Sequence, residues 1–265
     1  LPLEVLFEDE HIIALNKPPF MPTHPSHGHL TDTLANALAY RYACAGQPFV
    51  FRPLGRLDRN TSGVVVAGKN RAASGALGRA LIEGKVTKRY LAILEGEMPY
   101  DGRTHTLETF VYRPDFQGIR REVCDKHASG AEKAVTQYRV LAVANHHTLV
   151  LAQPKTGRTH QLRVHFSYLG HPILGDEIYG KASPLMDRHA LHALSLSLPL
   201  PFAATRDNHF QEAHPQPNAP DSEGRLHTWA PLPTDMKRII DLDFPNALPL
   251  DPTLDSLASL GFEDQ

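Results

Sequence analysis

The sequence predicts an α+β protein whose sheet is mixed and mainly antiparallel. Its apolar segments form short strand-like runs and helical stripes, without a regular strand–helix–strand repeat. The runs 5–7 and 12–15 are joined by a short acidic turn, which is typical of neighbouring antiparallel strands. No internal repeat is visible in the chain. We therefore expect a single domain over residues 1–265 rather than a string of βαβ units.

Strands are predicted where apolar residues run or alternate over several positions. The segment 63–67 is a continuous apolar run, as in a strand buried on both faces. In the segment 88–94, alternation places Tyr90, Ala92 and Leu94 on one face. The full set of expected strands is 5–7, 12–15, 63–67, 88–94, 134–143 and 149–153.

Two helices are predicted in the first third of the chain. The first has Thr31 or Asp32 as its N-cap and ends near Gly46. The second begins after Asn70 and ends at Gly84. Their apolar faces are expected to contain Leu34, Leu38 and Tyr42 in the first helix, and Leu77 and Leu81 in the second.

A third helix is predicted from Thr159, as N-cap, to about Leu169, where Gly170 would end it. A further short helix is expected at 236–240. In the third helix the apolar stripe would be Leu162, Phe166 and Leu169, and the polar face His160, Arg163 and Ser167. This element would present a guanidinium from a rigid support. In contrast, 201–233 is rich in Pro, Asn and His and is expected to be a long loop or insertion.

Composition excludes several classes of protein. No apolar run is long enough to cross a bilayer and no signal segment opens the chain, so we expect a cytoplasmic protein. The two cysteines, Cys44 and Cys124, are too few for a disulfide framework or a zinc knuckle. No coiled-coil pattern is visible, which favours a monomer.

The formal net charge is −2, but the charges are unevenly distributed. Within 52–89 only Asp58 and Glu83 oppose a run of basic residues, and 154–175 contains no acid. A polyanion such as RNA requires a basic surface of this kind, although the same charges could instead point in several directions. The basic residues of the first segment are Arg52, Arg56, Arg59, Lys69, Arg71, Arg79, Lys85, Lys88 and Arg89.

Asp58 is the most informative residue of the chain. It lies in the run Leu-Gly-Arg-Leu-Asp-Arg-Asn-Thr-Ser-Gly at 54–63, between Arg56 and Arg59. Nearby positive charge favours the ionised carboxylate, which could then act as a nucleophile. For this short run alone, an aspartate in a salt-bridged surface turn is the commoner interpretation.

Several further sequence motifs favour a catalytic role for Asp58 instead, because together they resemble the motifs of the RluA-type RNA pseudouridine synthases. The run 56–63 matches the first family signature, and 156–166 with 170–180 match a later one, Gly-Arg-Thr-His-Gln-Leu-Arg followed by Gly-x-Pro-Ile-x-Gly-Asp-x-x-Tyr-Gly. Several motifs in the family's order are far more specific than one. The chain departs from the family at Gly55, where histidine is usual. Weaker matches lie at 16–18, 88–93 and 191–193.

The resemblance implies the mixed-sheet fold of that family and assigns roles to three residues. Asp58 would be the catalytic carboxylate, although whether it attacks the ribose, attacks the base or deprotonates the sugar is open. Arg163 would pair with it, and Tyr90 would stack on the target uracil. From spacing alone, Tyr90 is as easily a core residue of a half-buried strand. The uridine would be flipped out of its stack to be reached.

The same resemblance implies contacts with structured ribosomal or transfer RNA. Arg56 would help displace the base, and Leu191 would form an apolar wall of the pocket. Lys17 could contact phosphate, or could belong to a structural turn. The remaining expected RNA contacts are Arg59, Arg158, His160 and Gln161. The absence of histidine at position 55 makes a flanking-nucleotide contact from that position doubtful.

No cofactor is expected, because the isomerisation involves neither redox chemistry nor phosphoryl transfer, and the chain has no glycine-rich phosphate loop. No metal is expected either. Histidines cluster at His24, His27 and His29, but no carboxylates or cysteines complete a ligand set. Two rival classes remain: a catalytically silent RNA-binding protein on the same fold, and a metal-dependent hydrolase that uses the histidines.

Overall fold

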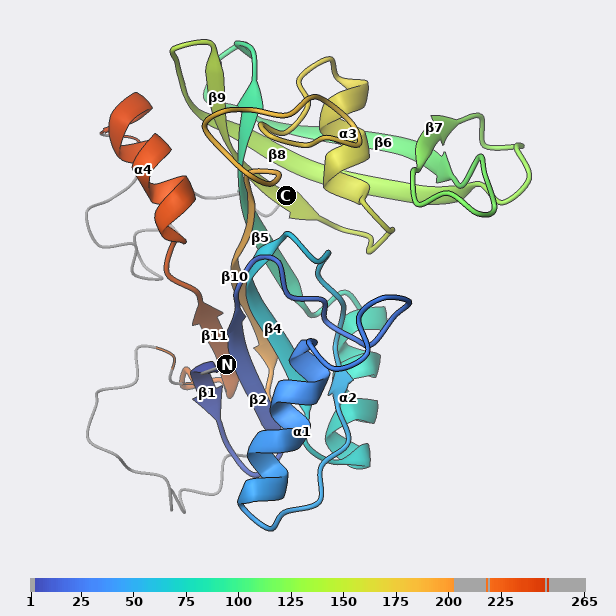
Figure 1. The fold of residues 1–265 in the computed structure, drawn as a ribbon, viewed down its shortest axis with the longest axis vertical. Coiled ribbons are helices and arrows are strands. Elements are labelled where there is room, and N and C mark those ends of the chain that lie inside the picture. The colour runs from blue at the N-terminus through green and yellow to red at the C-terminus, as the bar shows by residue number, and fades with distance from the viewer. Residues whose placement is uncertain (1–2, 203–217, 219, 246, 248–265) are drawn as a thin grey trace. The chain divides into compact units, whose positions relative to one another are not determined.

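The structure is a computed structural model that describes residues 3–202, 218, 220–245 and 247 (Figure 1). Its chain divides into two compact units. Unit 1 comprises residues 1–88 and 193–231, and unit 2 comprises residues 89–192 and 232–265. Each unit is a sheet with helices, so the predicted α+β class with mainly antiparallel pairing is confirmed. The expectation of one catalytic domain stays a prediction.

Unit 1 is a sheet with the strand order β1-β2-β4-β10, and β3 and β11 pair with β4 and β10. The pairs β1–β2, β2–β4, β3–β4 and β10–β11 are antiparallel. Its strands are β1 (Glu4–Glu8), β2 (Ile12–Lys17), β3 (Arg52–Pro53), β4 (Ser62–Gly68), β10 (Leu191–Pro199, of which the first two residues belong to unit 2) and β11 (Arg225–Trp229), and its helices are α1 (Leu34–Cys44) and α2 (Arg71–Ile82).

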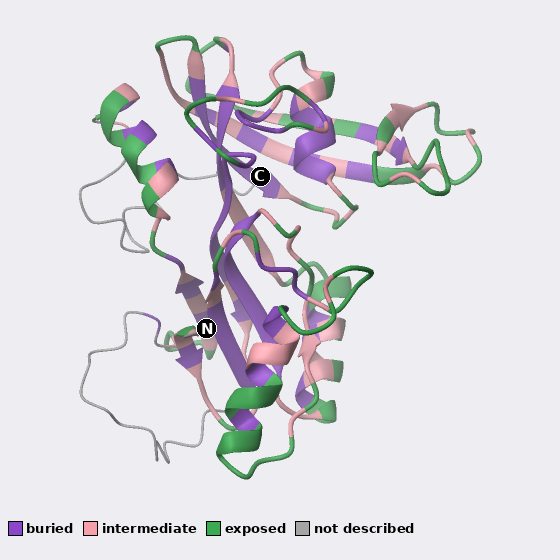
Figure 2. Ribbon diagram, viewed as in Figure 1, coloured by how far each residue is buried: buried purple, intermediate pink, exposed green. Residues whose placement is uncertain are grey.

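Strand β4 is the centre of unit 1, and all of its residues are buried (Figure 2). Side chains alternate across a strand, and they divide here between two apolar clusters. Val64 and Val66 belong to the cluster that contains Leu77 of α2, and Val65 belongs to the cluster that contains Leu38 of α1. The prediction of a strand buried on both faces at 63–67 is therefore confirmed. Position 63 requires glycine, because φ is +109° and a Cβ would collide with the backbone of Ala193.

The two predicted helices of unit 1 are confirmed, with two corrections. Helix α1 begins after Thr33, not after Thr31 or Asp32, because the side chains of Thr33 and Asn36 form a reciprocal capping box. Its buried face is Leu34, Leu38 and Tyr42, as predicted. Helix α2 is capped by Asn70, as predicted.

The second correction concerns the apolar face of α2. The buried residues are Ala73, Leu77 and Ala80, whereas Leu81 is 39% exposed. The buried residues are thus four and then three positions apart along the helix. Leu81 lies at the edge of this buried stripe, in the last turn.

The strands of unit 2 have the order β5-β9-β8-β6-β7, and all of these neighbouring pairs are antiparallel. Helix α3 packs on this sheet through Val164, which contacts Val111 and Ala134 in one apolar cluster. The elements are β5 (Thr87–Glu95, of which the first two residues belong to unit 1), β6 (Thr104–Tyr112), β7 (Glu122–Cys124), β8 (Glu132–Ala144), β9 (His147–Pro154), α3 (Gln161–Tyr168) and α4 (Thr234–Asp243).

The prediction of a long loop at 201–233 is wrong in part. Residues 225–229 form strand β11, which pairs with β10 from Pro199 opposite Arg225 to Ser195 opposite Trp229. In this strand buried and half-buried residues alternate: Leu226 and Thr228 are buried, and their neighbours are less so. The polar composition of the segment made this alternation hard to recognise in the sequence. Residues 203–217 and 219 of the expected loop lie outside the described part. Helix α4 covers the expected turn at 236–240 and is longer.

Burial in α2 makes a stability prediction with an internal control. Truncation of the fully buried Leu77 to alanine should lower the free energy of unfolding by roughly 2–5 kcal/mol, because it removes packed methyl groups from the unit 1 core. Ile82→Ala, on the same helix but 87% exposed, should change it by less than about 0.5 kcal/mol. Urea unfolding followed by circular dichroism measures both. Equal losses in the two variants would contradict the assigned core.

Candidate active site

In unit 1, the candidate catalytic residue Asp58 lies on the loop between β3 and β4. Asp58 is half-buried, and Arg56 and Arg59 on either side of it are exposed. The backbone turns directly after the carboxylate, where the amide of Thr61 donates to the carbonyl of Asp58 at 3.1 Å. The loop therefore presents one carboxylate between two cations near the surface of the unit, as expected from the sequence.

Lys17 fixes this loop from the C-terminal side of Asp58. Its side chain is fully buried at the end of β2, and Nζ donates to the carbonyls of Pro18 and Met21, both at 2.8 Å, and of Arg59 at 3.1 Å. Donation to carbonyl oxygens offsets part of the cost of burying an ammonium group. The amine thus joins the end of β2 to the Asp58 loop. The RNA contact predicted for Lys17 stays a prediction.

Thr23 fixes the same loop from the N-terminal side of Asp58. Its buried hydroxyl donates to the carbonyl of Leu57 at 2.9 Å and accepts from the amide of Leu57 at 3.3 Å. A residue on each side of the carboxylate is therefore bonded to the segment that follows β2. Such bonds restrict the loop before any substrate arrives, which is the preorganisation that a catalytic carboxylate requires.

Gly55, where the chain departs from the family signature, lies beside another amine. A Cβ at this position would lie 3.0 Å from Nζ of Lys88, so any larger side chain would require Lys88 to move. Burial lowers the pKa of Lys88 below its usual range. His24 lies close enough to Arg56 to be affected by it: burial lowers the His24 pKa first, and the Arg56 charge lowers it further.

In unit 2, several of the candidate residues lie around Arg163. The side chain is buried on α3 and makes a two-pronged ion pair with Asp176, from Nε to Oδ2 at 2.7 Å and from Nη2 to Oδ1 at 2.8 Å. Burial raises the pKa of Asp176, but the hydrogen bonds and charge of Arg163 outweigh it, so the net shift is downward. The guanidinium also lies 5.1 Å from the ring centroid of Tyr179. Arg163 is thus held in one orientation.

The start of α3 differs from the prediction. His160, not Thr159, is the N-cap, and its φ of +57° is left-handed, with no capping bond from its side chain. Gln161 fixes the turn that leads into the helix: Oε1 accepts from the amide of Arg158 at 3.0 Å and from the hydroxyl of Thr156 at 2.8 Å. The buried side chain of Gln161 therefore ties residues 156 and 158 to the first turn of α3, but it does not cap the amides of that turn.

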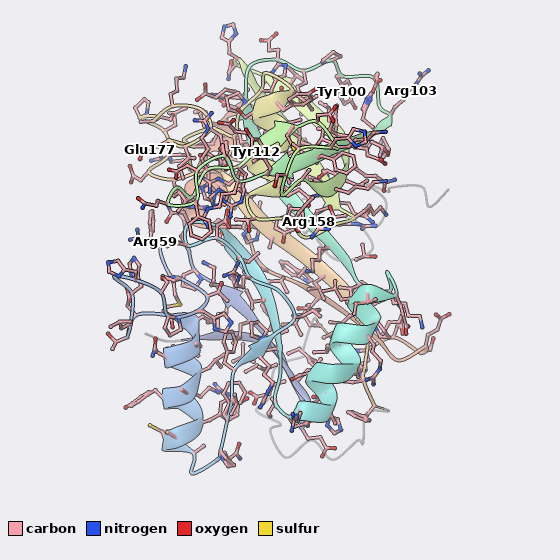
Figure 3. The ribbon with its side chains drawn as sticks, turned by 90° about the vertical axis from the view of Figure 1, so that its right-hand side faces the viewer. Arg59, Tyr100, Arg103, Tyr112, Arg158 and Glu177 are labelled. Atoms are coloured by element: carbon pink, nitrogen blue, oxygen red, sulfur yellow. The ribbon has the colours of Figure 1, made fainter. Side chains whose placement is uncertain are left out.

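Three other predicted RNA contacts lie around this turn. Arg158, labelled in Figure 3, is bonded to the carbonyl of Lys133 and to the carboxylate of Glu132 at 2.8 Å. His160 bonds the Tyr179 hydroxyl through Nδ1 at 2.8 Å. Gln161 also donates to β8, so its visible contacts are internal. The structure therefore brings Arg158, His160, Gln161 and Arg163 together on unit 2.

Tyr90 and Leu191 are also placed on unit 2. Tyr90 is half-buried on β5, opposite Ala152 of β9. Leu191 is buried at the start of β10, and its carbonyl accepts from Nη1 of Arg188 at 3.2 Å. Both are on strands, as expected for a platform and a pocket wall, and the roles themselves stay predictions.

The sequence reasoning missed several residues that support Arg163. Asp176 and Tyr179 lie in the matched run 170–180, but the sequence alone assigned them no role. His165 was missed as well. It is fully buried between two hydroxyls, with Nδ1 2.9 Å from Thr136 Oγ1 and Nε2 2.9 Å from Thr109 Oγ1, and burial lowers its pKa to about 4.

Among the residues that the structure describes, no group of three His, Cys, Asp or Glu side chains is arranged to hold a metal ion. His29, from the histidine cluster, bonds Asp32 at 2.6 Å. No helix in the described part is both long and apolar enough to span a membrane.

Known proteins that are similar to this chain are RNA pseudouridine synthases. A family model described as RNA pseudouridylate synthase matches residues 11–168. Among curated relatives, the uncharacterized RNA pseudouridine synthase YhcT of Bacillus subtilis is 36% identical over 239 residues, covering 89% of this chain and 71% of the relative. The ribosomal large subunit pseudouridine synthase D of Zymomonas mobilis is 35% identical over 221 residues, covering 81% of this chain and 66% of the relative.

A solved structure titled Human RNA Pseudouridylate Synthase Domain Containing 1 has a TM-score of 0.61 at 29% identity, covering 91% of this chain and 94% of the other. The fold and the matched signatures define an RNA-modifying isomerase. The chain belongs to the RluA-type RNA pseudouridine synthase family, which confirms the resemblance seen in the sequence.

The buried His165 makes a prediction about pH. In the unfolded chain this histidine takes up a proton near its ordinary pKa of 6.5, whereas in the folded protein it does so only near 4. Stability should therefore fall as the pH drops from 6.5 towards 4, by up to about 3 kcal/mol from this group alone. Urea unfolding of wild type and His165→Gln at several pH values isolates the effect. A wild-type-minus-variant difference that does not change with pH would contradict it.

Proposed function

We propose that this enzyme isomerises specific uridines of structured ribosomal or transfer RNA to pseudouridine, with Asp58 as the catalytic carboxylate. The observation that carries the proposal is the Asp58 loop itself. It matches the first family signature, and Lys17 and Thr23 bond it on both sides of the carboxylate. The relative named as a ribosomal large subunit synthase supports ribosomal RNA as the first substrate to examine.

The reaction requires a carboxylate but no redox partner. The bond between C1′ of the ribose and N1 of uracil breaks, the base turns, and C1′ bonds to C5. The proton on C5 is lost and N1 gains one, so atoms and charge balance without a cofactor. In the proposal Asp58 acts by attack on the ribose, by attack on the base, or by removing a proton from the sugar.

Arg163 is assigned the role of orienting the Asp58 carboxylate and favouring its charged form. The motif match supports the assignment, and so does the rigidity of the side chain, since Asp176 takes up two of its nitrogens. An arginine already fixed by a bidentate pair loses little further entropy when it binds a second carboxylate.

Tyr90 is assigned the role of stacking on the flipped uracil, with Leu191 as an apolar neighbour of the base. An aromatic platform compensates the stacking that the base loses when it leaves the RNA helix. Arg56, Arg59 and Arg158 carry cations on partly or fully exposed side chains, which suits phosphate contact. The alternative of a silent RNA-binding protein requires the same surface but no carboxylate.

The first test is a pseudouridine map of total RNA from cells that lack this protein, complemented with wild type or with Asp58→Ala. Wild type should restore modification at one or a few uridines, and Asp58→Ala should restore none. The variant protein should still bind RNA, because only the carboxylate is removed. Restoration by Asp58→Ala would refute the assignment of the catalytic residue, and no responding site with wild type would favour RNA binding without chemistry.

The second test is the variant Arg163→Lys, assayed in single turnover on an RNA that contains the mapped uridine. A lysine cannot reproduce the two-pronged contact, so the rate at saturating enzyme should fall by roughly 100-fold. Arg238→Lys, at an exposed arginine of α4 bonded to the Leu185 carbonyl, is the matched control and should leave the rate unchanged. A saturating rate for Arg163→Lys within twofold of wild type would remove the assigned role.

A further inference from the structure

Phe20 has a backbone conformation that is unusual for its residue type. Its φ is +62°, in the left-handed region that glycine adopts readily and bulky residues rarely do. Its side chain is 48% exposed, and among the described residues it makes no ring stacking or cation–π contact. The residue is therefore only half-buried, although its backbone is held in a strained conformation.

The residues on both sides of Phe20 are held by hydrogen bonds and by burial. The left-handed backbone of Phe20 therefore belongs to a fixed segment and not to a loose loop. Lys17 Nζ binds the carbonyls of Pro18 and Met21, on the two sides of Phe20. Met21 is buried in the apolar cluster beneath α1, and the next carbonyl, that of Pro22, accepts from the amide of Leu34 at 2.9 Å. The exposed ring is therefore displayed from a fixed support. Strained residues held in this way occur preferentially at functional sites.

The support is shared with the Asp58 loop. The same Lys17 amine that binds the Met21 carbonyl binds the Arg59 carbonyl at 3.1 Å. Thr23, three residues after Phe20, is bonded to Leu57 in both directions. An exposed aromatic ring thus lies on the segment that is tied to the candidate catalytic loop, together with the exposed cations Arg56 and Arg59.

We propose that Phe20 is a stacking platform for an unpaired RNA base that flanks the target uridine. The inference rests on the proposed function and adds a binding contact to it. A phenyl ring offers every base a face to stack on, and neighbouring arginines hold the adjoining phosphates, which is the usual composition of a single-stranded RNA surface. The target uracil itself is assigned to Tyr90, so Phe20 acts on a neighbour of the target.

The first experiment locates the contact without knowledge of the target. Full-length Asp58→Asn protein is irradiated at short ultraviolet wavelength with total cellular RNA, digested, and analysed by mass spectrometry for peptides that carry a nucleotide. The adduct should map to Phe20. Adducts on the Arg56 or Arg59 segment with none on Phe20 would overturn the platform. No adduct anywhere on the protein would instead contradict RNA binding, and with it the proposed function.

The second experiment separates stacking from stability. Phe20→Gly relieves the left-handed backbone, so its thermal midpoint should rise, while its affinity for an unmodified transcript of bacterial large-subunit ribosomal RNA should fall about 10-fold. Phe20→Trp keeps an aromatic face and should bind within about twofold of wild type. His146→Gly is the matched control, because His146 also has a positive φ, +60°, in the turn between β8 and β9. It should gain stability and bind as wild type does.

Two results would overturn the platform. One is wild-type affinity in Phe20→Gly, which would show that the ring contributes nothing to RNA binding. The other is an equal loss in Phe20→Gly and Phe20→Trp, which would show that stacking is not the contribution. Failure of the wild-type protein to bind the transcript, with crosslinks also absent, would count against the proposed function itself.

Discussion

The buried ammonium group of Lys17 is the interaction on which the unit 1 part of the site depends. It joins three backbone carbonyls from two segments that are far apart in the sequence, and so fixes the end of β2, the Phe20 segment and the Asp58 loop relative to one another. Removal of the amine would leave those carbonyls buried without their donor, which costs more than the bonds contribute when formed. One charge therefore sets the shape of a surface loop that local sequence preferences alone would leave variable.

In unit 2, the buried side chain of Arg163 is central to a similar network of bonds. Arg163 is held by Asp176 and lies over the ring of Tyr179, whose hydroxyl is bonded to His160 at the start of the same helix. His165, two residues after Arg163 on α3, is neutral at ordinary pH because it is buried between two hydroxyls. Helix α3 is short and poorly capped by its own residues, so its position comes from these tertiary bonds and not from helix propensity.

The sequence predicted the elements whose pattern is local. Strand β4 and the buried face of α1 follow from apolar runs and spacing, and the matched motifs identified the family. The start of α3 at His160 was missed because the side chain of His160 makes no capping bond, and Gln161 after it is held by contacts with β8 that no local pattern reveals. Strand β11 was missed because its pairing with β10 determines it. Asp176 was overlooked because the partner of a buried arginine is fixed by the tertiary fold. The left-handed backbone of Phe20 has no local sequence signal, and the carbonyls on its two sides are held by Lys17 from β2.

The most direct test of the central claim, that Asp58 performs uridine isomerisation, is tritium release by the purified full-length protein. The substrate is large-subunit ribosomal RNA transcribed with uridine tritiated at C5, because formation of the new C1′–C5 bond expels that hydrogen. Wild type should release tritium in single turnover from the mapped positions, and Asp58→Asn, which keeps the size of the side chain but not its charge, should release none above background. Release by Asp58→Asn at a rate near that of wild type would contradict the account.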